Sequence, residues 1–226
     1  MCYKLRYKMV KKILLLIWIN LIVGGCLAQQ TWHCQGYDEA MRKFEDVEKK
    51  FKSKGNKTWA RELLQVFPIA ADKTIKHQFV IKSDSTFDVK TISQLLLAWC
   101  KIKFPEATPD SVTSHEHLRV SGILKGVGQT MGAYGTYINA REEVMIDVKG
   151  DRVRVTSRIF NYMVGTWKGA EHTLPGDGFP VIPDASQKDS HAMAFINSNY
   201  NCLLTVSNLI KYLNDNVKTI NNDDDW

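Results

Sequence analysis

Apolar residues recur at helical spacing in four stretches of the chain. The first two stretches, residues 37–51 and 58–67, lie close together near the N-terminal side. A third stretch covers residues 91–103, and the longest stripe runs over residues 198–217. A period of three to four residues predicts helices that bury one side. Ser198 is the expected N-cap of the last helix, because a serine side chain can accept from the first free backbone amides.

Alternating apolar and polar residues, which are typical of strands with one buried face, fill the centre of the chain. The sequence "HQFVIK" predicts one strand, and residues 112–118 and 119–127 predict two more. Residues 142–160 predict a hairpin that turns at residues 149–151, "KGD". Residues 162–188 are rich in Gly, Pro, Asp and Ser and predict a long loop. The central order is strand, helix, four strands, helix, which indicates the α+β class with two helices on one face of an antiparallel sheet.

Five of the fourteen glycines lie in residues 121–135, "SGILKGVGQTMGAYG". A glycine-rich run can hold a phosphate, but that use requires a motif spacing and a following helix. This run matches neither G-x-G-x-x-G nor a P-loop, and the residues after it do not show a helical pattern. We therefore expect a strand whose glycines allow a bend, a bulge or the close approach of another backbone.

The first 28 residues have the order of a secretory signal peptide. Five basic residues precede an apolar run at residues 13–23, and small residues follow it. Cleavage after Ala28 is favoured, and the alternative is a lipoprotein signal in which Cys26 is acylated. Translation can start at Met1 or at Met9. We expect a periplasmic or secreted protein, which is anchored to the outer membrane only in the lipidated alternative.

The net charge changes when this leader is removed. The whole chain carries +6, from 30 basic and 24 acidic residues. The five basic residues of the leader account for most of that excess, and residues 29–226 carry +1. A nearly neutral domain lacks the general attraction to phosphates that nucleic-acid-binding proteins show, so no nucleic-acid partner is expected.

The central segments resemble a known family. With the order of elements above, "FVIK", "LLLAWCKIKF", "VSGILKGVG" and "MIDVKGDRVRVTSRIF" look like secreted bacterial domains of unknown function with a TATA-box-binding-protein-like (TBP-like) fold. The resemblance implies a curved antiparallel sheet with helices on its convex side. It implies no catalytic residue, because no activity is established for the family, and a DNA-binding role would rest on the fold name alone. The expected parts are a signal peptide (1–28), a helical N-terminal extension (29–74), the TBP-like domain (75–165), a long loop with the C-terminal helix packing on the domain (166–217) and a disordered tail (218–226).

A stripe of cations on the last predicted strand is the strongest candidate for a binding site. Arg152, Arg154 and Arg158 share one face of this strand, opposite its apolar face. Together with Lys149 of the preceding turn they could bind an anionic ligand such as an acidic glycan or a lipid head group. The alternative is a solvated face whose charge is balanced by Glu142, Glu143 and Asp147.

Two histidines form the candidate metal site. His115 and His117 in "SHEH" would point to the same face of a strand, and two imidazoles at that spacing can bind a metal with a third ligand from elsewhere. The spacing is also common in exposed strands without any metal. The long loop adds candidate contact residues for a sugar or a protein, which are Trp167, His172, Asp177 and Phe179.

Enzyme chemistry finds little support in the sequence. Neither G-x-S-x-G, H-E-x-x-H nor S-x-x-K occurs. Three cysteines follow the leader: Cys34, Cys100 and Cys202. Their odd number implies no closed disulfide framework, although two of them could still form one disulfide. Cys100 and Cys202 lie in apolar helical patterns, which are typical of buried thiols.

The sequence therefore predicts an exported binding domain without a cofactor. It would bind an envelope protein or a small ligand through one face of the sheet, and it would meet the membrane only through a lipidated Cys26. The alternative is a metal-dependent or hydrolytic periplasmic enzyme with a site near His115 and His117.

Overall fold

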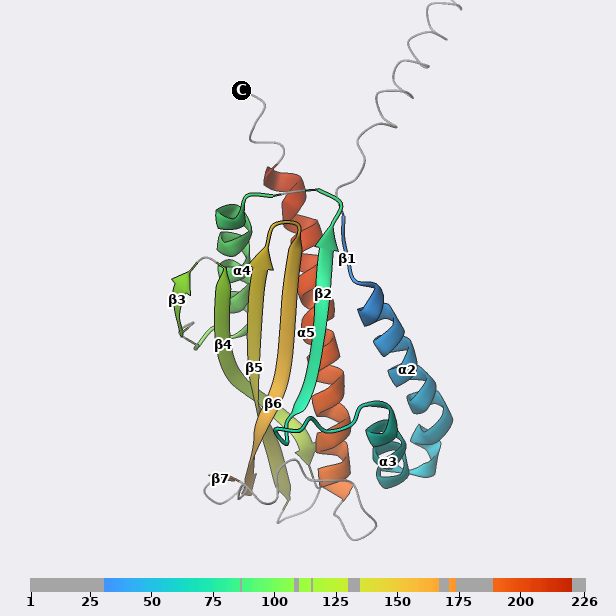
Figure 1. Cartoon of the computed structure of the whole chain (residues 1–226). Helices are drawn as coiled ribbons and strands as arrows, with labels where there is room; N and C mark the ends of the chain where they lie inside the picture. The colour runs from blue at the N-terminus through green and yellow to red at the C-terminus, as the bar shows by residue number, and fades with distance from the viewer. Residues whose placement is uncertain are drawn as a thin grey trace, which may run out of the picture.

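The computed structural model describes residues 31–85, 87–107, 110–114, 116–129, 135–166, 171–173 and 189–220, and they form helices packed against one antiparallel sheet (Figure 1). The elements in chain order are β1 (Trp32–His33), α2 (Gln35–Phe51), a 3-10 turn (Lys52–Lys54), α3 (Asn56–Val66), β2 (Ile75–Ser83), α4 (Val89–Lys103), β3 (Asp110–Ser114), β4 (His117–Gln129), β5 (Thr136–Lys149), β6 (Arg152–Thr166), β7 (His172–Thr173) and α5 (Asp189–Ile220). The predicted central order of strand, helix, four strands and helix is confirmed by β2, α4, β3 to β6 and α5.

The strands of the sheet follow the order β1-β2-β6-β5-β4-β3, and β7 pairs with β6. The strands β3 to β6 form the expected meander, and β2 returns to pair with β6. Lys149 lies opposite Arg152, so the predicted hairpin turns through Gly150 and Asp151, and Gly150 has the positive φ of 58° that such a tight turn requires. The α+β class and the curved antiparallel sheet are therefore confirmed.

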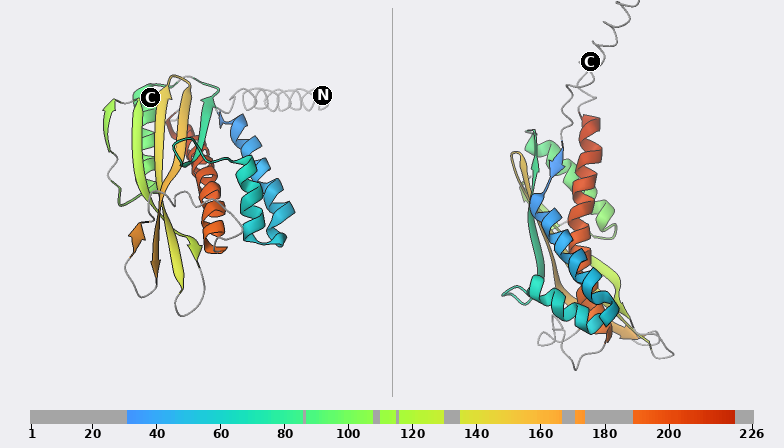
Figure 2. Two further views of the ribbon diagram at one scale, coloured as in Figure 1. Left: turned by 60° about the horizontal axis from the view of Figure 1, so that its bottom comes forward. Right: turned by 90° about the vertical axis from the view of Figure 1, so that its right-hand side faces the viewer.

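Helices α4 and α5 cover one face of the sheet, as the two further views show (Figure 2). The core between these layers contains Trp99 of α4, Val144 of β5 and Leu209 of α5. A second cluster of buried residues joins α2 and α3 to α5 and includes Phe44 and Leu63. The N-terminal helices thus extend the helical layer sideways past β2. Within the described residues, no helix combines the length and the apolar character needed to cross a membrane.

The last helix begins earlier than the sequence pattern predicts. It starts at Asp189, and Ser198 is a fully buried residue in its interior instead of its N-cap. The Ser198 hydroxyl lies 2.9 Å from the hydroxyl of Tyr162. The prediction was wrong because the first turns of α5 contain Ser and Asn between their apolar residues, which interrupts the apolar stripe in the sequence. In the structure these polar residues are buried together with the apolar ones.

Several strand boundaries also differ from the prediction. The strand β6 continues to Thr166 and includes residues that we expected in the long loop. Most of that expected loop lies outside the described residues. The short strand β1 was not predicted, because Trp32 is buried by distant parts of the chain: it lies opposite Ser83 of β2 and stacks on Phe87. Two residues are too few for a periodic pattern.

The glycine-rich run forms strand β4 with the expected bulge and close approach. The register against β5 shifts between Leu124 and Gly128, and Gly126 has a φ of 68°. A Cβ atom on Gly122 would lie 2.0 Å from the ring of Phe104, and one on Gly128 would lie 2.3 Å from a backbone oxygen of α5. These two glycines let the loop after α4 and the start of α5 pack directly on the strand.

Candidate functional site

The face of the sheet opposite α4 and α5, called the open face here, is turned toward the viewer in Figure 1. Its side chains alternate with core residues, because successive residues of a strand point to opposite faces. In β6, Arg152, Arg154 and Arg158 lie on the open face, while Val153 and Val155 are buried in the core. The structure thus brings the three predicted arginines together on one surface.

Three cations form a row across one end of the open face, and we call them the cationic row. Lys149 of β5 lies opposite Arg152 of β6, and Arg152 lies opposite Lys82 of β2. Neighbouring strands are about 4.8 Å apart, so the row spans roughly 10 Å. In the part of the chain that the structure describes, its only ion-pair contact is Nε of Arg152 with Asp151 at 3.6 Å. The cationic row therefore presents most of its charge to solvent.

The next position along the open face holds a carboxylate between two basic side chains. Asp147 of β5 lies opposite both His117 of β4 and Arg154 of β6. Its Oδ1 atom is 2.6 Å from Nδ1 of His117, and its Oδ2 atom accepts a 2.7 Å hydrogen bond from Nε of Arg154. Partial burial opposes the charged form, but these two partners outweigh it and lower the pKa of Asp147. Arg154 is thus partly neutralised.

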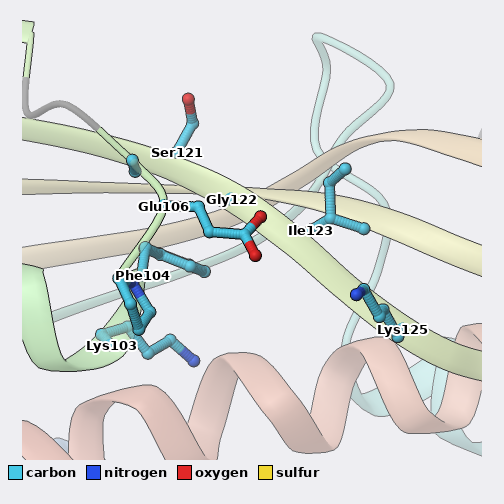
Figure 3. Close-up of a pocket in the computed structure, with 9 residues that line it drawn as sticks. Lys103, Phe104, Glu106, Ser121, Gly122, Ile123 and Lys125 are labelled. Carbon is cyan, nitrogen blue, oxygen red and sulfur yellow. The ribbon is translucent and has the colours of Figure 1, made fainter.

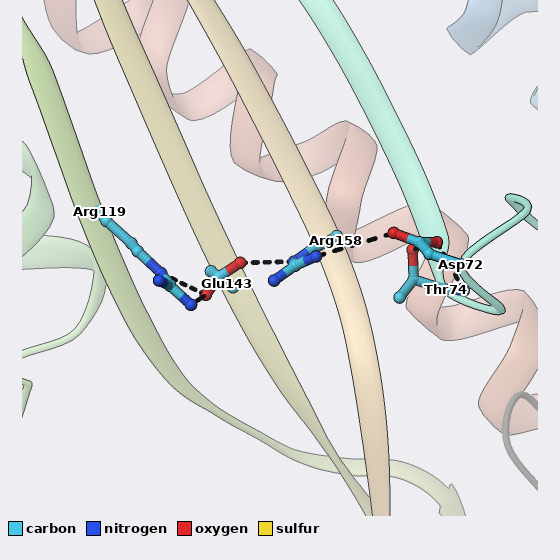
Figure 4. A network of polar contacts seen from close by, with 5 residues as sticks. All are labelled: Asp72, Thr74, Arg119, Glu143 and Arg158. Carbon is cyan, nitrogen blue, oxygen red and sulfur yellow. Dashed lines mark hydrogen bonds and ion pairs between the residues drawn. The ribbon is translucent and has the colours of Figure 1, made fainter. Parts of the chain in front are cut away.

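Further along, Glu143 lies between two arginines on the open face (Figure 4). Its side chain is 3% exposed, and its two oxygens accept hydrogen bonds from Nε of Arg119 and Nε of Arg158, each at 2.5 Å. Arg158 also lies 3.8 Å from Asp72, whose carboxylate accepts a 2.6 Å hydrogen bond from the hydroxyl of Thr74. One buried carboxylate therefore orients two guanidinium groups from strands on either side of it.

The open face keeps a net positive charge despite these ion pairs. Its cations are Lys76, Lys82, Arg119, Lys125, Arg141, Lys149, Arg152, Arg154 and Arg158. The carboxylates on it or at its margin are Asp72, Asp84, Asp147, Asp151 and Glu143. Nine cations against five carboxylates leave +4, while residues 29–226 as a whole carry +1. The positive charge of the domain is therefore concentrated on this surface.

Glu142 does not belong to the acids that balance this surface, contrary to the alternative drawn from the sequence. It points to the helical side, where its side chain is fully buried. Its Oε1 atom accepts hydrogen bonds from Ser157 and Thr205, and its Oε2 atom lies 3.0 Å from Nζ of Lys103. Adjacent residues of a strand point to opposite faces, so only one of the two glutamates can reach the arginines.

The candidate metal site is only partly described. His115 lies outside the described residues, and the ring of His117 is exposed and held by Asp147. Among the described residues, no group of three potential metal ligands comes together. Of the candidate loop residues, His172 lies exposed in β7, and Trp167, Asp177 and Phe179 lie outside the described residues, as does Cys26.

The three cysteines after the leader are buried and free. Burial raises the pKa of the Cys100 thiol to about 12 and also raises the pKa of Cys34 and Cys202. A raised pKa keeps a thiol protonated at neutral pH, and a protonated thiol is a poor nucleophile. The buried thiols predicted for Cys100 and Cys202 are confirmed.

The sequence did not identify Lys82, Arg119 and Arg141 as part of this surface. They belong to three different strands, β2, β4 and β5, and only the strand register places them on the same face as the arginines of β6. It also did not identify a pocket of about 400 Å³ between strand β4 and the loop after α4 (Figure 3).

Comparisons with known proteins show similarity to solved structures. No family model matches the sequence, and no curated protein matches it. A solved structure described as a TBP-like protein from Parabacteroides distasonis ATCC 8503 is similar, with 14% sequence identity and a TM-score of 0.46. The alignment covers 66% of this chain and 97% of that chain. The description has the same fold name that the sequence resemblance implied, and a likeness of this extent says nothing about activity.

Proposed function

We propose that this protein is a non-enzymatic binding domain of the cell envelope that binds an acidic ligand on its open sheet face. The observation that supports this most is the cationic row of Lys82, Arg152 and Lys149. These cations come from three strands, lie within roughly 10 Å and make one ion-pair contact among the described residues. Rigid strands hold their backbones, so a ligand with several anionic oxygens has to order only the side chains when it binds.

The ion pairs next to the row support the same function. Asp147 and Glu143 fix the side chains of Arg154 and Arg158. A fixed guanidinium presents its remaining N–H groups in a defined direction, which suits carboxylate or phosphate groups. A ligand that extends along β6 from the row would meet these arginines next.

Isothermal titration calorimetry with two probes tests the proposal. Tetragalacturonate supplies carboxylates, and inositol hexakisphosphate supplies phosphates. We expect one of them to bind, with an affinity that falls as salt is added. The double variant Lys82→Gln/Arg152→Gln should weaken binding at least about tenfold, since one charge-assisted hydrogen bond contributes roughly 1.5 kcal/mol.

The matched control is Lys49→Gln/Lys101→Gln, which removes two exposed cations from helices α2 and α4. It changes the net charge by the same amount and should leave the affinity within about twofold. Equal losses in both double variants would show a general charge effect and would argue against a site on the open face.

Export is the second part of the proposal, and the sequence of residues 1–28 supports it. Intact mass of the protein purified from a bacterial host distinguishes a chain that begins at Gln29 from a chain acylated at Cys26. The alternative function, a metal-dependent or hydrolytic site near His115 and His117, is tested by metal analysis. A stoichiometric metal that disappears in His117→Ala would favour the enzyme over the binding domain.

A further inference from the structure

The edge of the sheet at β4 is only half covered. Strand β3 pairs with β4 at His117 and Arg119, and in the described chain no strand pairs with the same edge beyond that point. Figure 1 shows β3 beside one end of β4 only. On the other side of β4, Ser121 to Leu124 stay in register with β5. The next register shift follows Leu124, so four residues of regular strand have a free edge.

The free edge lies against the pocket that the sequence did not reveal. The pocket has a volume of about 400 Å³, and β4 forms one wall while the loop after α4 forms the other (Figure 3). Phe104 closes the helical side of the pocket, because its ring packs on Gly122. Ile123 points the other way and is 47% exposed. The edge and the pocket thus form one continuous surface.

The charges differ between the two sides of this edge. On the open-face side, Ile123 is flanked by Lys125 in the pocket and by Arg141, which lies opposite it in β5. Both cations lack an ion-pair partner in the described chain. On the side of α4 and the loop after it, Lys103 and Glu106 line the pocket (Figure 3), and Lys103 is already paired with the buried Glu142. An acidic side chain would be attracted on the first side and repelled on the second.

We infer that this edge binds an extended acidic peptide segment of a partner protein, which adds to the sheet as a strand beside β4. Backbone groups of Ser121 to Leu124 that point away from β5 would pair with the peptide backbone. Side chains of the peptide alternate between the two sides, so acidic ones would face Lys125 and Arg141 and apolar ones would pack on Phe104. The ligand is therefore a peptide in which apolar and acidic residues alternate. This site is separate from the cationic row.

Fluorescence polarisation with a synthetic probe tests the inference. The probe is a labelled nine-residue peptide of alternating valine and aspartate with blocked ends. We expect saturable binding to the purified protein, at least tenfold weaker binding of the peptide with lysine in place of aspartate, and at least tenfold weaker binding to Lys125→Glu. Lys90→Glu, which reverses an exposed charge in the first turn of α4, is the control and should bind as the unmodified protein does.

Two measurements can overturn the inference. N-methylation of alternate backbone amides removes the hydrogen-bond donors from one edge of the extended probe. That edge can then no longer pair with β4 as a strand. Equal binding of both N-methylated registers would exclude strand addition. Sedimentation equilibrium without any peptide tests whether a second copy of the chain occupies the edge. If the protein is a dimer and Lys125→Glu dissociates it, then a second copy of the chain occupies the edge instead of a partner peptide.

Discussion

Glu142 and Glu143 are neighbours in β5, and they show how differently the two faces of the sheet bury a carboxylate. Glu142 is enclosed by the helical layer and meets one cation, Lys103, with hydroxyl groups from Ser157 and Thr205. Glu143 is on the open face, where two arginine side chains cover it and are themselves partly exposed to solvent. Glu142 is thus buried by the helical layer, and Glu143 is buried by the two arginine side chains that pair with it.

The difference has an energetic consequence. Solvent cannot replace a lost partner on the helical face, so an unpaired charge there would keep its full desolvation penalty. On the open face, water and the second arginine can compensate. Changes at equivalent positions should therefore destabilise the protein more on the helical face than on the open face.

The largest effect is expected for Lys103→Met. It removes the cation beside a fully buried carboxylate, so the free energy of unfolding at pH 7 should fall by about 3 kcal/mol. Urea unfolding followed by circular dichroism measures this change. Lys101→Met, an exposed position of the same helix, should change the stability by less than about 0.5 kcal/mol.

A double variant sharpens this prediction. Lys103→Met/Glu142→Gln should recover most of the lost stability, because the uncompensated charge is gone. No recovery would mean that Lys103 stabilises the protein through packing on Phe104 instead of through the ion pair.

The second prediction compares Gly122 with Ser121, adjacent residues of β4 on opposite faces. Gly122→Ala would place a Cβ atom 2.0 Å from the ring of Phe104, so we expect a loss of about 2 kcal/mol. Ser121→Ala on the exposed side should be nearly neutral. Thermal unfolding measures both, and Phe104→Leu should reduce the effect of Gly122→Ala by giving the new methyl group space.

The third prediction concerns His77, which faces the helical layer from β2. Burial lowers its pKa, although a hydrogen bond with Asn199 partly opposes the shift. The folded protein therefore holds His77 neutral below its ordinary pKa of 6.5, while the unfolded chain takes up a proton. Stability is fully present above about pH 6.5 and should fall by at most about 1.4 kcal/mol per pH unit as the pH decreases toward the folded pKa.

Urea unfolding between pH 7.5 and pH 5 measures this slope. His77→Phe should be less stable at neutral pH and should show a flatter profile, because the titrating group is absent. His33→Gln, an exposed position in β1, is the control and should keep the original slope. An unchanged slope in His77→Phe would assign the pH dependence to other groups.

The smallest effect is expected for Arg158→Met on the open face. Glu143 keeps Arg119 as a partner, so the loss in stability should be about 1 kcal/mol or less. The double variant Arg119→Met/Arg158→Met should lose more than the two single variants together, because Glu143 would then have no cation. Additive losses would show that solvent already compensates for the arginines.

The patterns along the chain predicted most of the fold. The strand and helix order, the hairpin at Gly150 and the bulged glycine-rich strand follow from alternation, turn chemistry and glycine placement, which are local properties. The start of α5 was wrong because its first turns mix Ser and Asn with apolar residues. The buried Ser198 is satisfied by Tyr162 of β6, a partner 36 positions away that local sequence cannot indicate.

The candidate site was predicted only in part, because it also depends on contacts between distant parts of the chain. Arg152, Arg154 and Arg158 share a face because a strand alternates, and one strand is enough to see that. Lys82 and Arg119 join them only through the register with β2 and β4. The division of Glu142 and Glu143 between two faces also follows from alternation, but which face the helices cover does not.

The sequence by itself determined the elements and their order, because periodicity and turn preference act over a few residues. The tertiary structure alone decided which surface became the open face, which charges were neutralised there and which part of the β4 edge has no partner strand among the described residues. Those outcomes depend on strand order, on register and on the place of the long α5 helix, and each of these joins residues that are far apart in the chain. Burial and ion pairing act through space, so only the folded chain assigns partners to Glu142 and Glu143.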